Sequence, residues 1–295
     1  MCQWAERPFV MRGELALRHV TRSDPDAIAL VACGLVRHQQ AYVVDGFRQR
    51  ASTRFIETYE QLERELPALQ RCDAFVLAIQ DGRGRSPLEI VKALTREWPR
   101  AAIVIFCPPR AERPMWMPQL TLAGARGFVF EGVNDTSATL AQVVENARNE
   151  CVAEGVFTRL TTVVPDELQP MVNAVLARPA DVSTVETLAS DLGVHRKTLV
   201  NRCTRARFPG PAELINWCRL ALVAELLATT GQTVESIALT LGFPSHTALR
   251  NLIKRYTGMR ATDLREGDAV GTVIGRLQAR MKKGTEPTVR ELPIQ

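Results

Sequence analysis

The chain has 295 residues, a net charge of +5 and a pI near 9.0, values that favour an acidic partner without identifying it. The longest apolar run near the start, residues 27–36, is about half as long as a membrane span, and residues 1–26 are too charged for a signal peptide. The seven cysteines show no CxxC or CxxH spacing and the four histidines lie far apart, so neither a disulfide framework nor a metal site is expected. We predict a cytoplasmic protein of two domains that needs no cofactor.

The first half of the chain, after an N-terminal segment at residues 1–26, alternates strand and helix patterns. Strands are expected at residues 27–33, 54–59, 74–79, 101–106 and 127–130. Helices are expected at residues 38–48, 59–69, 87–97, around 114–118 and at 136–151. This alternation predicts an α/β domain over residues 27–153, a doubly wound parallel sheet of flavodoxin-like order.

The spacing of these elements resembles the receiver domains of bacterial two-component response regulators. The resemblance implies an acidic pair for Mg²⁺, a phosphoacceptor aspartate, a Ser or Thr and a lysine at the strand ends. The matching positions of this chain are occupied by Ala32 and Cys33, Ala78, Cys107 and Glu131. The oxygen ligands, the nucleophile and the cation are therefore missing. We interpret the domain as a pseudo-receiver that is not phosphorylated and serves dimerisation or partner contact.

Two residues of this domain leave alternatives open. Asp81 follows the third strand and is a weak candidate for a displaced phosphoacceptor, although a turn aspartate is the simpler interpretation. Cys107 at a strand end would suit a thiol enzyme, but Phe106, Pro108 and Pro109 are poor neighbours for a nucleophile elbow. We predict no enzyme activity. A small-molecule sensor is the main alternative for the domain, and a thiol enzyme is the third.

The second half of the chain is helical in pattern, after a coil linker expected at residues 154–165. Apolar spacing predicts helices at residues 165–176, 185–192, 195–205, 212–229, 233–242 and 245–256. Residues 266–295 are predicted to form a C-terminal tail that is partly disordered, with a short helix at residues 270–281.

Capping residues mark where several of these helices begin and end. The sequence Ser-Thr-Val-Glu at residues 183–186 forms a capping box, and Thr233 and Ser245 are candidate N-caps. Gly193 and Gly242 follow short helices, where a left-handed residue ends a helix most easily. A short helix, a glycine turn and a second helix with a polar, basic outer face are typical of a helix-turn-helix reader of the DNA major groove.

This helix-turn-helix pattern occurs twice, about 50 residues apart. Residues 188–193 (LASDLG) match residues 237–242 (IALTLG), and residues 198–201 (TLVN) match residues 248–251 (ALRN), with Pro244 as one extra residue in the second turn. An internal repeat of a whole unit is far harder to obtain by chance than a single copy. The repeat therefore favours two DNA readers over a helical hairpin in an unrelated bundle.

The segments LASDLG, IALTLGF at residues 237–243 and YTGMRATDLR at residues 256–265 resemble the DNA-binding domain of the AraC/XylS family of bacterial transcription regulators. The resemblance covers residues 166–265. It implies an all-α domain of seven helices with two helix-turn-helix units that bind promoter DNA as a monomer or dimer, and activators of the family usually contact RNA polymerase. We predict a sequence-specific transcription regulator that forms a homodimer.

Family positions that face DNA supply the candidate site. In the first unit they are Arg196, Lys197, Val200 and Asn201, and in the second unit they are His246, Thr247, Arg250 and Asn251. Arg205, Lys254 and Arg255 lie in basic runs without an acidic residue and complete the candidate site. Asn201 and Asn251 recur at matching points and are favoured for base contact, because Asn can pair twice with adenine. For Lys254 and Arg255, phosphate contact or solvation is the simpler expectation. His195 stands where a serine cap is usual.

Overall fold

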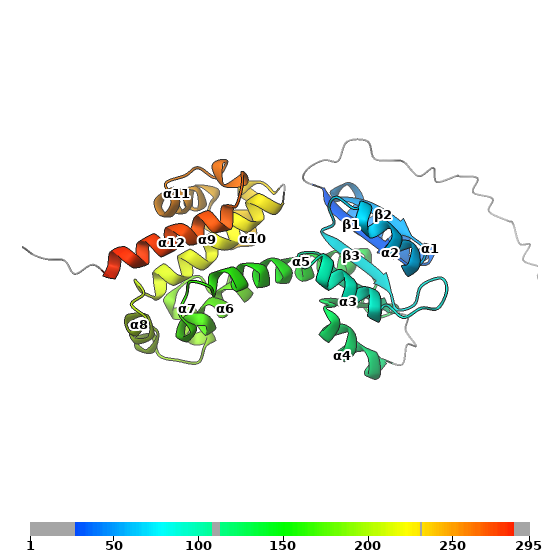
Figure 1. The fold of residues 1–295 in the computed structure, drawn as a ribbon, viewed down its shortest axis with the longest axis horizontal. Coiled ribbons are helices and arrows are strands. Elements are labelled where there is room, and N and C mark those ends of the chain that lie inside the picture. Colours follow the sequence, from blue (N-terminus) through cyan, green and yellow to red (C-terminus); the bar gives the residue numbers. More distant parts are fainter. Residues whose placement is uncertain (1–26, 108–112, 231, 286–295) are drawn as a thin grey trace, which may run out of the picture.

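The computed structural model describes residues 27–107, 113–230 and 232–285, which form an α/β domain and an all-α domain connected by one long helix (Figure 1). The predicted N-terminal segment, residues 1–26, and the last part of the predicted tail lie outside the described residues. No helix in the described ranges combines the length and the apolarity that a bilayer crossing requires.

Five parallel strands form the sheet of the α/β domain in the order β2-β1-β3-β4-β5. The strands are β1 (Ile28–Cys33), β2 (Ala51–Ile56), β3 (Ala74–Ala78), β4 (Ala102–Cys107) and β5 (Gly127–Phe130). This is the predicted flavodoxin-like order, which is therefore confirmed. Strand β2 begins three residues before its predicted start at residue 54.

Helices cover both faces of this sheet, which explains why β3 and β4 are continuous apolar runs. The helices are α1 (Arg37–Phe47), α2 (Tyr59–Glu65), α3 (Leu88–Glu97), α4 (Arg113–Ala123) and α5 (Ser137–Leu160). On one face α1 and α5 pack against alternate residues of the strands, such as Leu30 and Val104. On the other face α2, α3 and α4 pack against the intervening residues, such as Val31 and Ile103.

Helix α5 crosses from one domain to the other, and the coil linker expected at residues 154–165 is wrong for residues 154–160. Its first half packs on the sheet through residues such as Val144 and Cys151. Its last turns bury Val156 and Leu160 in the core of the all-α domain. The helix continues through Gly155 because both of its halves have a core to cover.

The all-α domain is built around α9, which is apolar on nearly every side and is buried along most of its length. Its helices are α6 (Gln169–Ala177), α7 (Val185–Asp191), α8 (Arg196–Arg205), α9 (Pro211–Thr229), α10 (Val234–Thr240), α11 (His246–Thr257) and α12 (Ala269–Thr285). Both α8 and α11 pack against α9, and Figure 1 shows them on either side of it.

Residues 269–285 form helix α12, which confirms the short helix expected at residues 270–281 and continues it to residue 285, where disorder was expected. The helix lies along α9 (Figure 1). Val270, Val273 and Leu277 are buried in the domain core. Packing against α9 supplies most of the stabilisation that such a helix needs.

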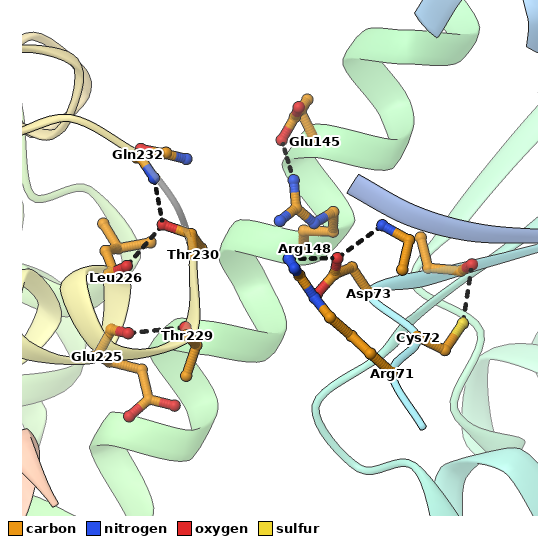
Figure 2. A network of polar contacts seen from close by, with 12 residues as sticks. Arg71, Cys72, Asp73, Glu145, Arg148, Glu225, Leu226, Thr229, Thr230 and Gln232 are labelled. Atoms are coloured by element: carbon orange, nitrogen blue, oxygen red, sulfur yellow. Dashed lines mark hydrogen bonds and ion pairs between the residues drawn. The ribbon is translucent and has the colours of Figure 1, made fainter. Parts of the chain in front are cut away.

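The domains also meet beside α5. Figure 2 shows polar groups of the α/β domain on one side of this helix and the C-terminal end of α9 on the other. On the α/β side, Asp73 accepts the backbone amide of Ala29 at 2.8 Å and pairs with Arg71 at 2.9 Å. Across the boundary, the buried Glu225 of α9 pairs with Arg100 at 3.5 Å. The continuous helix and this ion pair connect the two cores.

Candidate nucleic-acid interface

Two helix pairs, α7–α8 (the first unit) and α10–α11 (the second unit), begin each of their helices at a side-chain cap. Thr233 and Ser245 each accept an amide hydrogen bond at 3.1 Å from three residues further on, which confirms both predicted caps. Thr184 caps α7 one residue after the predicted Ser183. His195 caps α8, because its Nδ1 accepts the amide two residues further on at 3.2 Å. His195 thus performs the role that serine performs in the second unit.

The turns of the two units share one backbone geometry. Gly193 has a φ of 61° and Gly242 a φ of 68°, a left-handed conformation that favours glycine. The amide after each glycine donates to the carbonyl five residues earlier, at 2.9 Å in the first unit and 2.8 Å in the second. The repeat seen in the sequence is therefore a repeat in structure. It survives the extra Pro244, which lies after this turn.

The second helix of each unit buries one face and exposes the other. Leu199 and Cys203 of α8 are buried, as are Leu249 and Ile253 of α11. All candidate DNA-facing residues are exposed: Arg196, Lys197, Val200, Asn201, Arg205, His246, Thr247, Arg250, Asn251, Lys254 and Arg255. Val200 is 47% exposed although it is apolar. Among the described residues, no hydrogen bond involves the side-chain amides of Asn201 and Asn251, so both side chains are available to an outside partner.

An acidic residue of each first helix pairs with an arginine of the helix that follows it. Glu186 lies 2.8 Å from Arg196, and Glu235 lies 3.4 Å from Arg250. A hydrogen bond to its own backbone amide lowers the pKa of Glu235, and Arg250 lowers it further. Sequence reasoning missed these pairs. The available signal was the recurrence of glutamate at matching points of the repeat.

A buried arginine of α9 holds the turn of the second unit. Arg219 donates from Nη2 to the carbonyl of Leu241 at 2.7 Å, and its guanidinium carbon lies 3.9 Å from the ring centroid of Phe243. Burial lowers the pKa of its guanidinium. Leu241 ends α10, so the cation also faces the negative end of a helix. The sequence gives no local signal for this role, because the carbonyl that Arg219 binds lies 22 residues further along the chain.

Side-chain contacts hold both ends of the YTGMRATDLR segment, Tyr256 and Arg265, against α9. The ring of Trp217 meets that of Tyr256 edge-on at 4.8 Å, and Asn216 donates to the tyrosine hydroxyl at 2.9 Å. Arg265 donates to the carbonyl of Leu227 at 3.3 Å and to two later carbonyls. It therefore caps the C-terminal end of α9, which gives the last residue of the YTGMRATDLR segment a structural role.

In the α/β domain, the positions that correspond to a receiver site lie at the carboxyl ends of the strands. Ala78 and Cys107 end β3 and β4, and both are buried, Cys107 completely. Burial raises the pKa of the Cys33 thiol to about 12. Glu131 pairs with His38 of α1. A completely buried thiol is a poor nucleophile, so the geometry does not favour the thiol-enzyme alternative at Cys107.

Asp81 is a buried turn residue, only 6% exposed. Its carboxylate accepts the backbone amides of Tyr59, Arg83 and Arg85, each at 2.9 Å. Burial acts to raise the pKa of Asp81, but these hydrogen bonds outweigh it and hold that pKa below its ordinary value. Both carboxylate oxygens thus hold the loop in place, as expected of a turn aspartate.

Comparisons with known proteins agree with this geometry. A family model described as a helix-turn-helix domain matches residues 188–267, a range that includes helices of both units. Two proteins described as AraC-like transcription regulators, from Streptomyces lividans and Streptomyces antibioticus, are 36% and 35% identical over 88 residues. The match covers 30% of this chain and 29% of each relative, so the chain spans less than a third of their length.

Solved structures resemble the whole chain only weakly. A response regulator protein from Burkholderia pseudomallei is 17% identical with a TM-score of 0.36, over 58% of this chain and 96% of that one. The α/β assignment therefore depends on the strand order observed here. The family model matches the all-α part. Residues 188–267 match a helix-turn-helix domain family, and the chain is similar over 88 residues to two AraC-like transcription regulators.

Proposed function

We propose that this protein is a sequence-specific transcription regulator that reads promoter DNA through both units. The observation that carries the proposal is the structural repeat: matching caps, matching turns and matching buried positions present two exposed polar helix faces. Helix α9 lies between them and is about 28 Å long at 1.5 Å per residue. Consecutive major-groove faces are roughly 34 Å apart, so the two units suit adjacent turns of one duplex.

The exposed residues divide into two kinds of contact. Asn201 and Asn251 are proposed to read bases, and Val200 is proposed to meet an apolar group such as the methyl of thymine. The remaining basic residues supply phosphate contacts, which set affinity and position. Arg196 and Arg250 must leave Glu186 and Glu235 to reach DNA. Exposed ion pairs of this kind are weak enough to be exchanged for phosphate.

We expect Asn251→Ala to weaken binding to the preferred site by about 1–3 kcal/mol, because a bidentate base contact is lost. Affinity for random DNA should remain nearly unchanged. The site would first be found by genome-wide footprinting, and affinities would then be measured by fluorescence anisotropy. Asn149→Ala, an exposed asparagine of α5, is the matched control. Equal losses on specific and random DNA would remove Asn251 from the base-reading residues.

For the α/β domain we propose a pseudo-receiver role in homodimer formation or partner contact, without phosphorylation. Ala78 at the acceptor position and the engaged carboxylate of Asp81 support it. Residues 27–153 and 166–265 are the domain limits proposed from the sequence. The core of the second domain also includes the end of α5, from Val156, and the apolar face of α12. RNA polymerase is a proposed partner on the basis of family resemblance alone.

Acetyl phosphate should therefore leave the chain unmodified, since neither Ala78 nor the occupied carboxylate of Asp81 can act as an acceptor. Intact-mass spectrometry after incubation with acetyl phosphate and Mg²⁺ measures this directly. Phosphorylation of the chain would appear as a mass gain of one phosphoryl group. A gain that disappears in the Asp81→Ala variant would show that this aspartate is a phosphoacceptor after all.

A further inference from the structure

A cavity of about 280 Å³ lies where the C-terminal parts of α11 and α12 meet the first half of α9. Among its lining residues, only Arg255 belongs to the candidate DNA-facing set. Its lining includes Glu213 and Trp217 from α9, Arg255 and Tyr256 from α11, and Arg276 and Arg280 from α12. The two α12 residues lie beyond residue 267, where the match to the helix-turn-helix family model ends.

Positive charge dominates the cavity. Three guanidinium groups, those of Arg255, Arg276 and Arg280, line it together with the single carboxylate of Glu213. In the part of the chain that the structure describes, none of the three arginines forms an ion pair. Arg276 and Arg280 are four residues apart on one helix, where like charges repel each other. An anion between these groups would relieve the repulsion, and arginine forks suit phosphate oxygens.

A buried tryptophan with an unpartnered hydrogen-bond donor is among the residues that line the same cavity. Trp217 is 3% exposed, and its indole Nε1 has no hydrogen-bond partner among the described residues. This N–H can only donate, so it requires an acceptor. Buried donors without partners are rare in folded proteins and call for an explanation. The indole and the arginines are all donors, and a ligand that only accepts would complement them.

We propose that this cavity binds a phosphate group. The group could belong to the backbone of the DNA that α11 contacts, or to a free phosphate-bearing molecule. The first source rests on the proposed function, because Arg255 is on the DNA-reading helix α11. The second source does not depend on DNA binding. In both cases α12 completes the anion site, because it contributes Arg276 and Arg280 to the cavity.

Binding of a free anion is tested first. The full chain is titrated with inorganic phosphate as the probe. Phosphate should raise the thermal unfolding temperature and change tryptophan fluorescence in a saturable way, relative to chloride at equal ionic strength. Arg276→Gln and Arg280→Gln should each reduce both responses. Arg96→Gln, an exposed arginine of α3, makes the same charge change in the other domain and should leave both responses intact.

DNA affinity measured against salt concentration then distinguishes the sources. If the cavity holds a backbone phosphate, Arg276→Gln and Arg280→Gln should each reduce the salt slope by about 1, on random as well as preferred DNA. A phosphate response with an unchanged slope assigns the cavity to a free anion. A chain that binds no DNA refutes the proposed function but leaves the phosphate measurement valid. Unchanged behaviour of both variants in both measurements overturns the proposal.

Discussion

The two helix-turn-helix units share their local construction but differ in how the domain holds them. A Cβ added at Gly193 would meet no described atom within 4 Å, whereas one added at Gly242 would lie 2.9 Å from the Cα of Ala180. Only the second turn receives the buried guanidinium of Arg219. The repeated residues thus build each unit, and residues outside the repeat fix its place in the domain.

Alanine in place of each turn glycine tests this difference and should give the largest effect. Both substitutions force a left-handed alanine, at about 1–2 kcal/mol. Gly242→Ala must also displace the backbone at Ala180, so we expect a total loss of about 3 kcal/mol. Chemical denaturation followed by far-ultraviolet circular dichroism measures both variants. Equal losses would mean that the second turn is no more tightly held than the first.

Removal of the Arg219 guanidinium should have an intermediate effect. Arg219→Met retains most of the side-chain volume but leaves the carbonyl of Leu241 without its donor, so we expect a loss of about 1–2 kcal/mol in the free energy of unfolding. Arg219→Lys keeps the cation at the end of α10 and should recover part of the loss. If the Arg219→Met variant were as stable as the parent chain, the desolvation cost of the buried guanidinium would be at least as large as the free energy that its hydrogen bond contributes.

The acidic pairs are a feature that the two units share, and their removal should have the smallest effect. Glu186→Gln and Glu235→Gln each free a reader arginine, so affinity for any DNA should rise by less than about tenfold. The rise should shrink as salt is added. Glu186→Gln should have the larger effect, because its ion pair is the shorter one. Anisotropy titrations at two salt concentrations measure this, and a fall in affinity would show that these glutamates orient the arginines for binding.

Much of the site could be predicted because its signals are local. Thr233 and Ser245 are caps whose partners lie three residues away, and the exposed face of α11 follows from helical periodicity alone. The same reasoning placed β1, β3 and β4, because each of these buried strands is a continuous apolar run. The predicted cap of α7, Ser183, is one residue away from the observed cap, Thr184, because adjacent Ser and Thr residues are equally able to cap a helix.

Long-range contacts account for what could not be predicted. Arg265 reaches a carbonyl 38 residues away, and Arg159 pairs with Asp268 across 109 residues at 2.7 Å. Neither partner is visible in a local pattern. The helical continuation of α5 past Gly155 depends on a second core that lies further along the chain. For the same reason, nothing in the local sequence showed that Arg276 and Arg280 would line a cavity with Trp217.

The sequence by itself determined the two fold classes, the repeated unit and the faces that its reader helices expose. Hydrophobic periodicity, caps and left-handed glycines act within a few residues, so these features need no knowledge of distant neighbours. Only the tertiary structure decided that α5 is one helix through both domains, that residues 269–285 complete the all-α core and that a buried arginine holds the second turn. Those outcomes depend on burial against partners far along the chain, which local propensity does not encode.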